Sequence, residues 1–108
     1  MFARIVTINL RPNSATEFTQ LIQNEVLPLL RNENGFQDGM TFLATGGTQA
    51  VAISLWGQRE HADAYNPDTY PTVLKTLGKV VEGTPEVRTY DVSNSTAHMI
   101  GARVAARG

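Results

Sequence analysis

The chain has 108 residues, of which 42% are hydrophobic and 18% charged, and its formal net charge is -1. That length is near the usual size of one domain and excludes an enzyme with separate cofactor and substrate domains. Nine basic residues balance ten acidic ones, so we expect no nucleic-acid partner. The sequence has no cysteine and no apolar run of the about 20 residues that a membrane helix needs, which favours a cytoplasmic protein with no membrane partner.

Alternating apolar residues predict a first strand over residues 2–10. A helix is expected to start at Ser14, because Ser14 and Glu17 have the spacing of a capping box. This helix should continue to about residue 31, and Pro28 should kink its last turn. The apolar face of the helix consists of Phe18, Leu21, Ile22, Val26, Leu29 and Leu30.

Two further strands are predicted over about residues 36–44 and 49–56, and the short glycine-rich connection between them favours an antiparallel hairpin. One face of the first of these strands is expected to carry Phe36, Met40, Phe42 and Ala44. The second strand has an apolar face and a face of three small residues and one large one, which are Ala50, Ala52, Ser54 and Trp56. This asymmetry predicts space beside the indole.

The second half of the chain predicts a short helix over residues 58–65, a break at Pro67 and a longer helix to about residue 81. The segment 83–85 is expected to end this helix, and residues 86–92 to form the last strand. The order βαββαβ predicts an α+β, ferredoxin-like fold, in which a four-stranded antiparallel sheet carries two helical segments on one face.

Two helices can cover only one face of such a sheet, and a chain of this length buries little surface by itself. Several positions on the other face are apolar, so we expect a homodimer that forms through the open sheet face. Residues 1–92 would then be a dimeric α+β barrel domain. Residues 93–108 would be a C-terminal tail that is mobile or packs on the partner subunit.

Three segments carry a resemblance to a known family: residues 26–31 followed by Gly35-Phe36, the strand end Leu55-Trp56, and residues 85–90. Over roughly residues 1–92 the chain resembles antibiotic-biosynthesis-monooxygenase-like domains of the dimeric α+β barrel superfamily. The resemblance implies oxygenation of phenolic or quinol-like aromatic compounds, without a cofactor or a metal, in a pocket between sheet and helices. A deprotonated aromatic can pass an electron to dioxygen, so the protein has only to hold it, favour its anion and exclude water.

The sequence offers six candidate site residues. The candidates for binding a small aromatic or conjugated ligand are Trp56, Tyr65, Tyr70 and Arg88. The candidates for catalysis, as a base, a proton shuttle and an oxyanion donor respectively, are His61, Tyr65 and Asn9. Each has a structural alternative, because an aromatic residue can simply fill the core and a lone polar residue can belong to the ordinary surface.

One relative within the family degrades haem with an asparagine on the first strand, a tryptophan at the end of the third and a histidine on the second helix. Only Trp56 matches here, since the first-strand position falls at Val6 and the second helix has no histidine, which disfavours haem degradation. Two functions remain: a small-molecule enzyme, and a non-catalytic binding or scaffold barrel. They differ in whether the layers enclose a pocket on the order of a few hundred Å³ with at least two converging polar groups.

Overall fold

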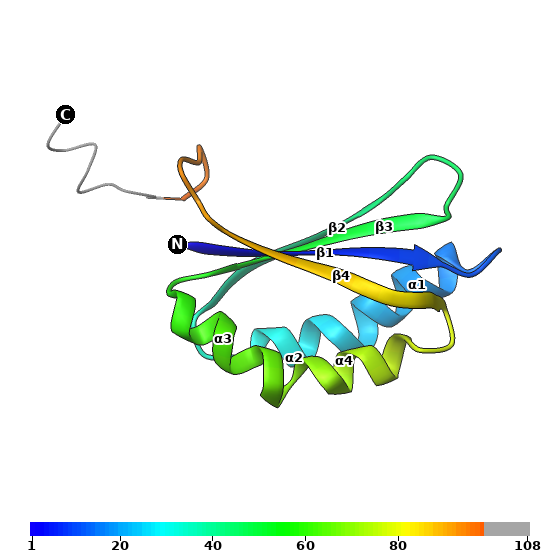
Figure 1. Cartoon of the computed structure of the whole chain (residues 1–108), viewed down its shortest axis with the longest axis horizontal. Coiled ribbons are helices and arrows are strands. Elements are labelled where there is room, and N and C mark those ends of the chain that lie inside the picture. Colours follow the sequence, from blue (N-terminus) through cyan, green and yellow to red (C-terminus); the bar gives the residue numbers. More distant parts are fainter. Residues whose placement is uncertain (99–108) are drawn as a thin grey trace, which may run out of the picture.

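The computed structural model describes residues 1–98, which form a four-stranded antiparallel sheet with helical segments on one face (Figure 1). The strands are β1 (Phe2–Leu10), β2 (Phe36–Leu43), β3 (Gln49–Trp56) and β4 (Val81–Asp91), and their order in the sheet is β2-β3-β1-β4. The helical segments are α1 (Ala15–Leu21), the π-helical turn η1 (Ile22–Val26), α2 (Leu27–Arg31), α3 (Arg59–Asp68) and α4 (Tyr70–Leu77). The predicted ferredoxin-like fold is confirmed. None of the helices within residues 1–98 is long and apolar enough to cross a membrane.

The first helical arm, α1-η1-α2, widens ahead of Pro28. The buried residues of this arm recur every four positions. In a regular α-helix, with 3.6 residues per turn, such a series would gradually rotate away from the sheet. The wider π-helical turn keeps the series on the side that faces the sheet. Pro28 has no N–H to donate, so the widened turn stands where the sequence predicts a kink. The buried residues of this arm are Phe18, Ile22, Val26 and Leu30.

The predicted capping box is wrong, although the helix begins where expected. Ser14 makes no capping hydrogen bond with its side chain, because its backbone is not extended as a capping serine requires (φ -106°, ψ 0°). Glu17 instead forms an exposed ion pair with Lys79, in the turn that follows α4, at 3.0 Å between Nζ and Oε2.

The second helical arm, α3-α4, breaks at Thr69 and not at Pro67, which lies inside the last turn of α3. Pro71 is the residue that interrupts the helical hydrogen bonds, because it has no N–H to donate to the carbonyl group four positions earlier. The Thr69 hydroxyl donates to Glu33 Oε1 at 2.8 Å, which ties this break to the end of the first arm.

The predicted end of the second arm is also wrong, because α4 stops at Leu77 and the segment 83–85 belongs to β4. The pairing of β4 with β1 shifts register between Thr7 and Asn9, so this segment bulges opposite the neighbouring strand. Gly83 permits the bulge with a φ of +72°. A glycine followed by a proline therefore marks a bulge in this chain and not a helix end.

The two faces of β2 differ from the prediction. A bulge between Phe36 and Asp38 shifts the alternation, so that Phe36 faces the helices and packs on Trp56 with ring centroids 5.7 Å apart. Met40 and Phe42 pair with Ile53 and Val51 on the opposite face, where both are about half exposed. Phe36 therefore does not share a face with Met40 and Phe42.

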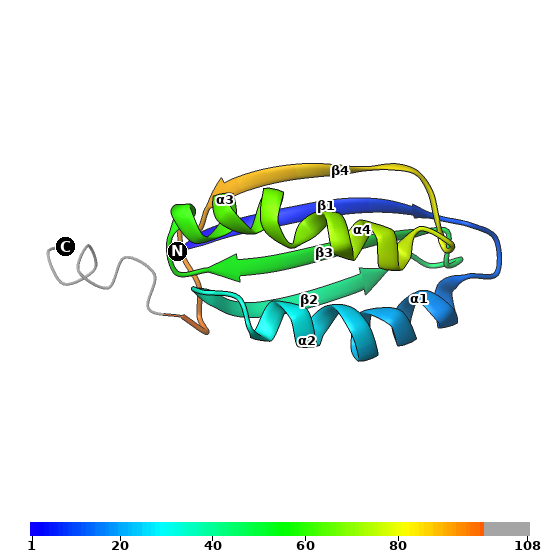
Figure 2. The ribbon, with the colours of Figure 1, turned by 90° about the horizontal axis from the view of Figure 1, so that it is seen from below.

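The helical arms leave one strand and one whole face of the sheet uncovered. Figure 2 shows the two arms running along β2, β3 and β1, with β4 outside them. Val87 and Tyr90 on β4 are accordingly exposed. At the end of β4 the Val92 N–H donates to the Met1 carbonyl at 3.0 Å, and His98 Nε2 then lies 3.3 Å from Asp38 Oδ2 on β2. The rest of the predicted tail, residues 99–108, lies outside the described residues.

Replacing Gly35 by alanine is expected to lower the free energy of unfolding by about 2–4 kcal/mol. Gly35 has a φ of +79°, and a Cβ atom there would overlap the ring of His61. Gly46→Ala is the matched control, because Gly46 has a φ of +99° but open space around it, and it should lose only about 1 kcal/mol. Urea unfolding measures both losses. Equal losses at the two glycines would show that the contact with His61 contributes nothing.

Candidate functional site

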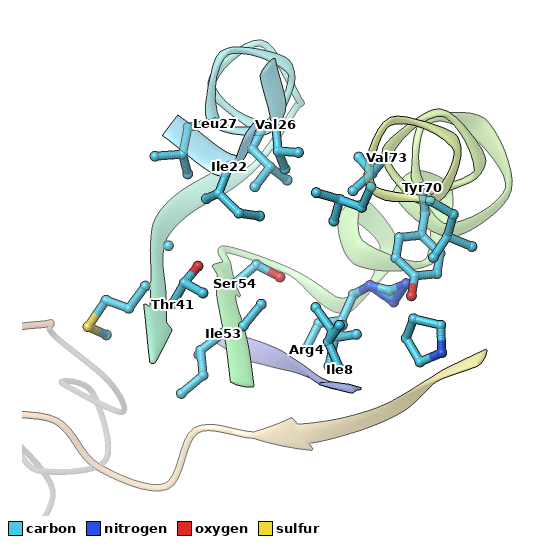
Figure 3. A pocket seen from close by; sticks show the side chains of 18 of the residues that line it. Arg4, Ile8, Ile22, Val26, Leu27, Thr41, Ile53, Ser54, Tyr70 and Val73 are labelled. Carbon is cyan, nitrogen blue, oxygen red and sulfur yellow. The ribbon is translucent and has the colours of Figure 1, made fainter. Parts of the chain in front are cut away.

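A cavity lies between the sheet and the two helical arms (Figure 3). Its empty space is about 650 Å³ including the open mouth, and about 60 Å³ of this accepts the centre of a water molecule. One water needs about 10–15 Å³ by that measure, so this space has room for the centres of several waters. Small residues of the sheet form its floor, Gly39, Ala52 and Ser54, and aliphatic residues of the arms form its walls, among them Ile22, Val26, Leu27 and Val73. The predicted space is present, but it is flanked by Tyr65 and Tyr70 and not by the indole.

Arg4 brings a positive charge into this cavity. The residue is only 3% exposed, and its Nη2 donates to Asn66 Oδ1 on α3 at 2.9 Å, while its buried Nε has no partner among residues 1–98. The centre of the guanidinium lies 4.1 Å from the centroid of the Tyr70 ring and 5.3 Å from that of Tyr65. Figure 3 shows Arg4 extending beneath Tyr70. Burial lowers the pKa of Arg4, but an arginine side chain keeps its proton in a protein.

The two tyrosines of the cavity are neutral at physiological pH. Burial raises the pKa of Tyr65 to about 12, although the positive charge of Arg4 acts in the opposite direction. Burial also raises the pKa of Tyr70, again against Arg4. Both phenols therefore serve as hydrogen-bond donors and not as bases.

Trp56 stands behind the cavity and does not line it. Its side chain is fully buried between Phe36 and Tyr65, the latter with ring centroids 5.1 Å apart. The indole Nε1–H donates to Ser54 Oγ at 2.9 Å, which leaves the Ser54 hydroxyl proton free to donate elsewhere. In Figure 3 the hydroxyl group of Thr41 points from the sheet toward the helices, and that of Ser54 points sideways, in the direction of Arg4. Trp56 thus positions two cavity residues, Ser54 and Tyr65.

The other predicted site residues lie away from the cavity. His61 on α3 packs against Gly35, and its buried Nδ1 has no hydrogen-bond partner among residues 1–98. Asn9 and Arg88 lie on the open face of the sheet, where a hydrogen bond to Glu86 Oε1 at 2.8 Å raises the pKa of Arg88. The structure therefore brings together Tyr65 and Tyr70 but not His61, Asn9 and Arg88. Within residues 1–98 no three His, Asp or Glu side chains gather as ligands of a metal ion would.

Arg4 is the site residue that the sequence analysis missed. In β1 the residues that face the helices alternate with those that face the open side, and Arg4 occupies a helix-facing position between Phe2 and Val6. Charged residues are rarely buried at such positions unless they are paired. An arginine at a position of the strand where the alternation predicts a buried side chain could therefore have identified this site residue from the sequence.

Comparisons with known proteins identify the fold. No protein-family model matches the sequence, and no curated protein sequence matches it. The structure is similar to that of the monooxygenase ActVA-Orf6 from Streptomyces coelicolor, determined in complex with nanaomycin D, with 19% identity, a TM-score of 0.73 and coverage of 87% of this chain and 88% of that one. SnoaB, a cofactor-independent oxygenase from Streptomyces nogalater, is 11% identical with a TM-score of 0.73 and coverage of 90% and 97%.

A third similar structure is a protein of unknown function from Nitrosomonas europaea, which is 14% identical with a TM-score of 0.73 and coverage of 88% of this chain and 91% of that one. The chain therefore has the fold of the antibiotic-biosynthesis-monooxygenase-like proteins, as the sequence resemblance implied. Since proteins with this fold include oxygenases and proteins without a known activity, the fold leaves the reaction to the residues of the cavity.

Stability is expected to fall between pH 10 and pH 12 because of Tyr65. Its pKa is 10.0 without perturbation and about 12 in the folded chain, so the stabilising contribution is complete below pH 10 and lost as the pH rises through 12. Two pKa units correspond to a loss of about 2–3 kcal/mol. Urea unfolding at several pH values measures this slope. Tyr65→Phe should flatten it, exposed Tyr90→Phe should not, and an unchanged slope in Tyr65→Phe would contradict the assignment.

Proposed function

We propose that the protein is a cofactor-independent monooxygenase that acts on planar, quinol-like aromatic compounds in this cavity. The proposal depends on one observation: an apolar cavity in which a buried guanidinium and two neutral phenols, those of Tyr65 and Tyr70, lie together. Apolar walls hold a flat ring system and exclude water, while the donors stabilise a negatively charged oxygen. That two proteins of the same fold are oxygenases supports the proposal.

The reaction needs no electron source beyond the substrate. A ring methylene group and one O₂ give a carbonyl group and one water molecule. The substrate anion passes one electron to O₂, and the resulting radical and superoxide combine to form a C–O bond and a peroxide anion. The peroxide takes up a proton, and loss of the remaining C–H proton with cleavage of the O–O bond releases water and leaves the carbonyl. Dioxygen is reduced by the electrons that the carbon atom loses.

Each residue of the cavity has a role in this proposal. Tyr65 keeps its proton because of its raised pKa, so it can donate to the peroxide anion. Tyr70 and the aliphatic walls hold the rings, and Trp56 positions Tyr65 from behind. His61 and Asn9 do not line the cavity, so we give them no part in the reaction.

Oxygen uptake with a panel of hydroxylated anthrones and quinols tests this function. The wild type should consume one O₂ per carbonyl formed, and Tyr65→Phe should lower kcat at least tenfold, because it removes the proton donor. Trp56→Phe should lower kcat less and cost about 1–2 kcal/mol of stability. Tyr90→Phe is the exposed control and should keep the wild-type rate. No turnover of any compound by the wild type would favour the non-catalytic binding or scaffold barrel.

We also propose that two copies associate through the open face of the sheet, with residues 1–92 as the structural unit. This face carries half-exposed Met40, Phe42 and Tyr90, and no helix of residues 1–98 covers it. An exposed apolar patch of this kind marks a binding surface, and a second copy with the same patch is its simplest partner. We place this homodimer in the cytoplasm, which suits a chain with no cysteine.

Sedimentation at micromolar concentration should give twice the chain mass of 11.8 kDa. Phe42→Glu should give a monomer, because it places a charge among the exposed apolar side chains of the open face. Val87→Glu is the matched control: Val87 is also exposed, but it pairs with Val6 on the helix-facing side, so this variant should remain a dimer. A wild type that sediments at 11.8 kDa would rule out the dimer.

A further inference from the structure

Arg4 holds a buried positive charge that no carboxylate of residues 1–98 neutralises. The ion pairs in this part of the chain involve other residues, and residues 99–108 contain no Asp or Glu. One nitrogen of Arg4 donates to the neutral amide of Asn66, and its Nε has no hydrogen-bond partner in the part of the chain that the structure describes. Burying a cation is costly unless a negative charge compensates for it. The site therefore lacks a counter-ion.

The groups packed around Arg4 do not supply that charge. The phenols of Tyr65 and Tyr70 are neutral, and their ring faces attract a cation less strongly than a carboxylate does. Asp63 lines a groove on the far side of Arg4, but its Oδ2 lies 3.6 Å from Nε of Arg59. Glu33 on the first arm accepts a hydrogen bond from the Thr69 hydroxyl. On the sheet, the neighbours of Arg4 are Ser54 of β3 and Thr89 of β4, which are both uncharged.

We propose that Arg4 binds an anionic oxygen of the ligand, so that the cavity selects planar aromatic molecules that carry an ionised phenol or a carboxylate. The inference rests on the proposed function, because it places the ligand in the same cavity. The rings lie over Ala52, between the aliphatic walls, and the anionic oxygen lies beside the guanidinium. The Ser54 hydroxyl, oriented by the indole N–H of Trp56, is a second donor to that oxygen. For an oxygenase this arrangement stabilises the aryloxide, which is the form that reacts with O₂.

Three coumarins test the preference for an anion: 7-hydroxycoumarin, 7-methoxycoumarin and coumarin-3-carboxylate. They share one flat ring system, and the hydroxyl compound changes its absorption when it ionises. At a pH where the phenol is ionised, at least one of the two anions should bind the wild type at least tenfold more tightly than the methoxy compound. If 7-hydroxycoumarin is the tighter anion, the ligand class is a phenol, and its pKa when bound should fall by about one unit, which equals a tenfold preference. If the carboxylate is the tighter one, the ligand class is an aromatic acid.

Two substitutions of Arg4 and one control complete the test. Arg4→Met keeps an unbranched apolar chain as far as the position of Nε but lacks the charged guanidinium, so the ratio of the affinities for the anion and for the methoxy compound should fall to about one. Arg4→Lys keeps the charge and should restore most of the preference. Arg31→Met removes an exposed arginine at the end of α2 and should leave all three affinities unchanged. If Arg4→Met does not fold, the pH dependence of the wild type decides, because its affinity for the tighter of the two ionisable coumarins must rise as that compound ionises.

The outcomes separate this inference from the proposed reaction. A preference for an anion without oxygen uptake on any substrate would support the role of Arg4 and remove the oxygenase function. Oxygen uptake without a preference for an anion would retain the oxygenase and overturn the role of Arg4. The role is also overturned if Arg4→Met keeps the preference, or if the wild type binds none of the coumarins.

Discussion

Two fully buried aromatic side chains hold the helical arms away from the sheet. Phe18 lies on α1 near one end of the helical layer and Trp56 at the end of β3 near α3, at the other (Figure 1). Between them, β3 directs only Ala50, Ala52 and Ser54 toward the helices, and none of these is long enough to fill the layer. Protein interiors are normally close-packed, so large side chains at the ends and small ones in the middle produce a cavity. The proposed ligand and the proposed reaction both depend on that space.

Inside the cavity, burial and charge have opposite effects on the two tyrosines. The positive charge of Arg4 favours a phenolate, but desolvation outweighs it, and the pKa of Tyr65 rises to about 12. The cavity therefore combines a permanent cation with neutral donors and contains no negatively charged base among its lining residues. Such a set of groups stabilises an anion but cannot remove a proton from a weakly acidic carbon atom. The proposed reaction therefore requires a substrate that ionises easily, with its anion favoured by Arg4, before O₂ can react with it.

The sequence predicted the elements that depend on simple alternation and failed where one residue changes the register. The bounds of β1 and β3 are confirmed, and these two strands pair with each other without a register shift. Phe36 was placed on the wrong face, since a bulge is a product of pairing and has no periodic signal of its own. Gly83 was taken as a helix end because its conformation suits both a bulge and a helix terminus. Arg4 stood in the sequence at a buried position of β1, but its meaning depends on Asn66 and Tyr70, which only the fold brings near.

The chain shares its fold with two oxygenases, but its sequence is only 11–19% identical to theirs. A shared fold at this identity says little about which reaction the chain catalyses. Arg4 says more. A barrel that only needs a packed core gains nothing from an arginine facing its helices, because an apolar side chain of similar length would avoid the cost of desolvation. The structure compensates part of that cost with the Asn66 amide and the face of the Tyr70 ring, and among the described residues, 1–98, the Nε atom of Arg4 has no hydrogen-bond partner. A negatively charged ligand would compensate the rest of the desolvation cost of Arg4. The uncompensated cost of burying this arginine is therefore itself an argument for a binding site.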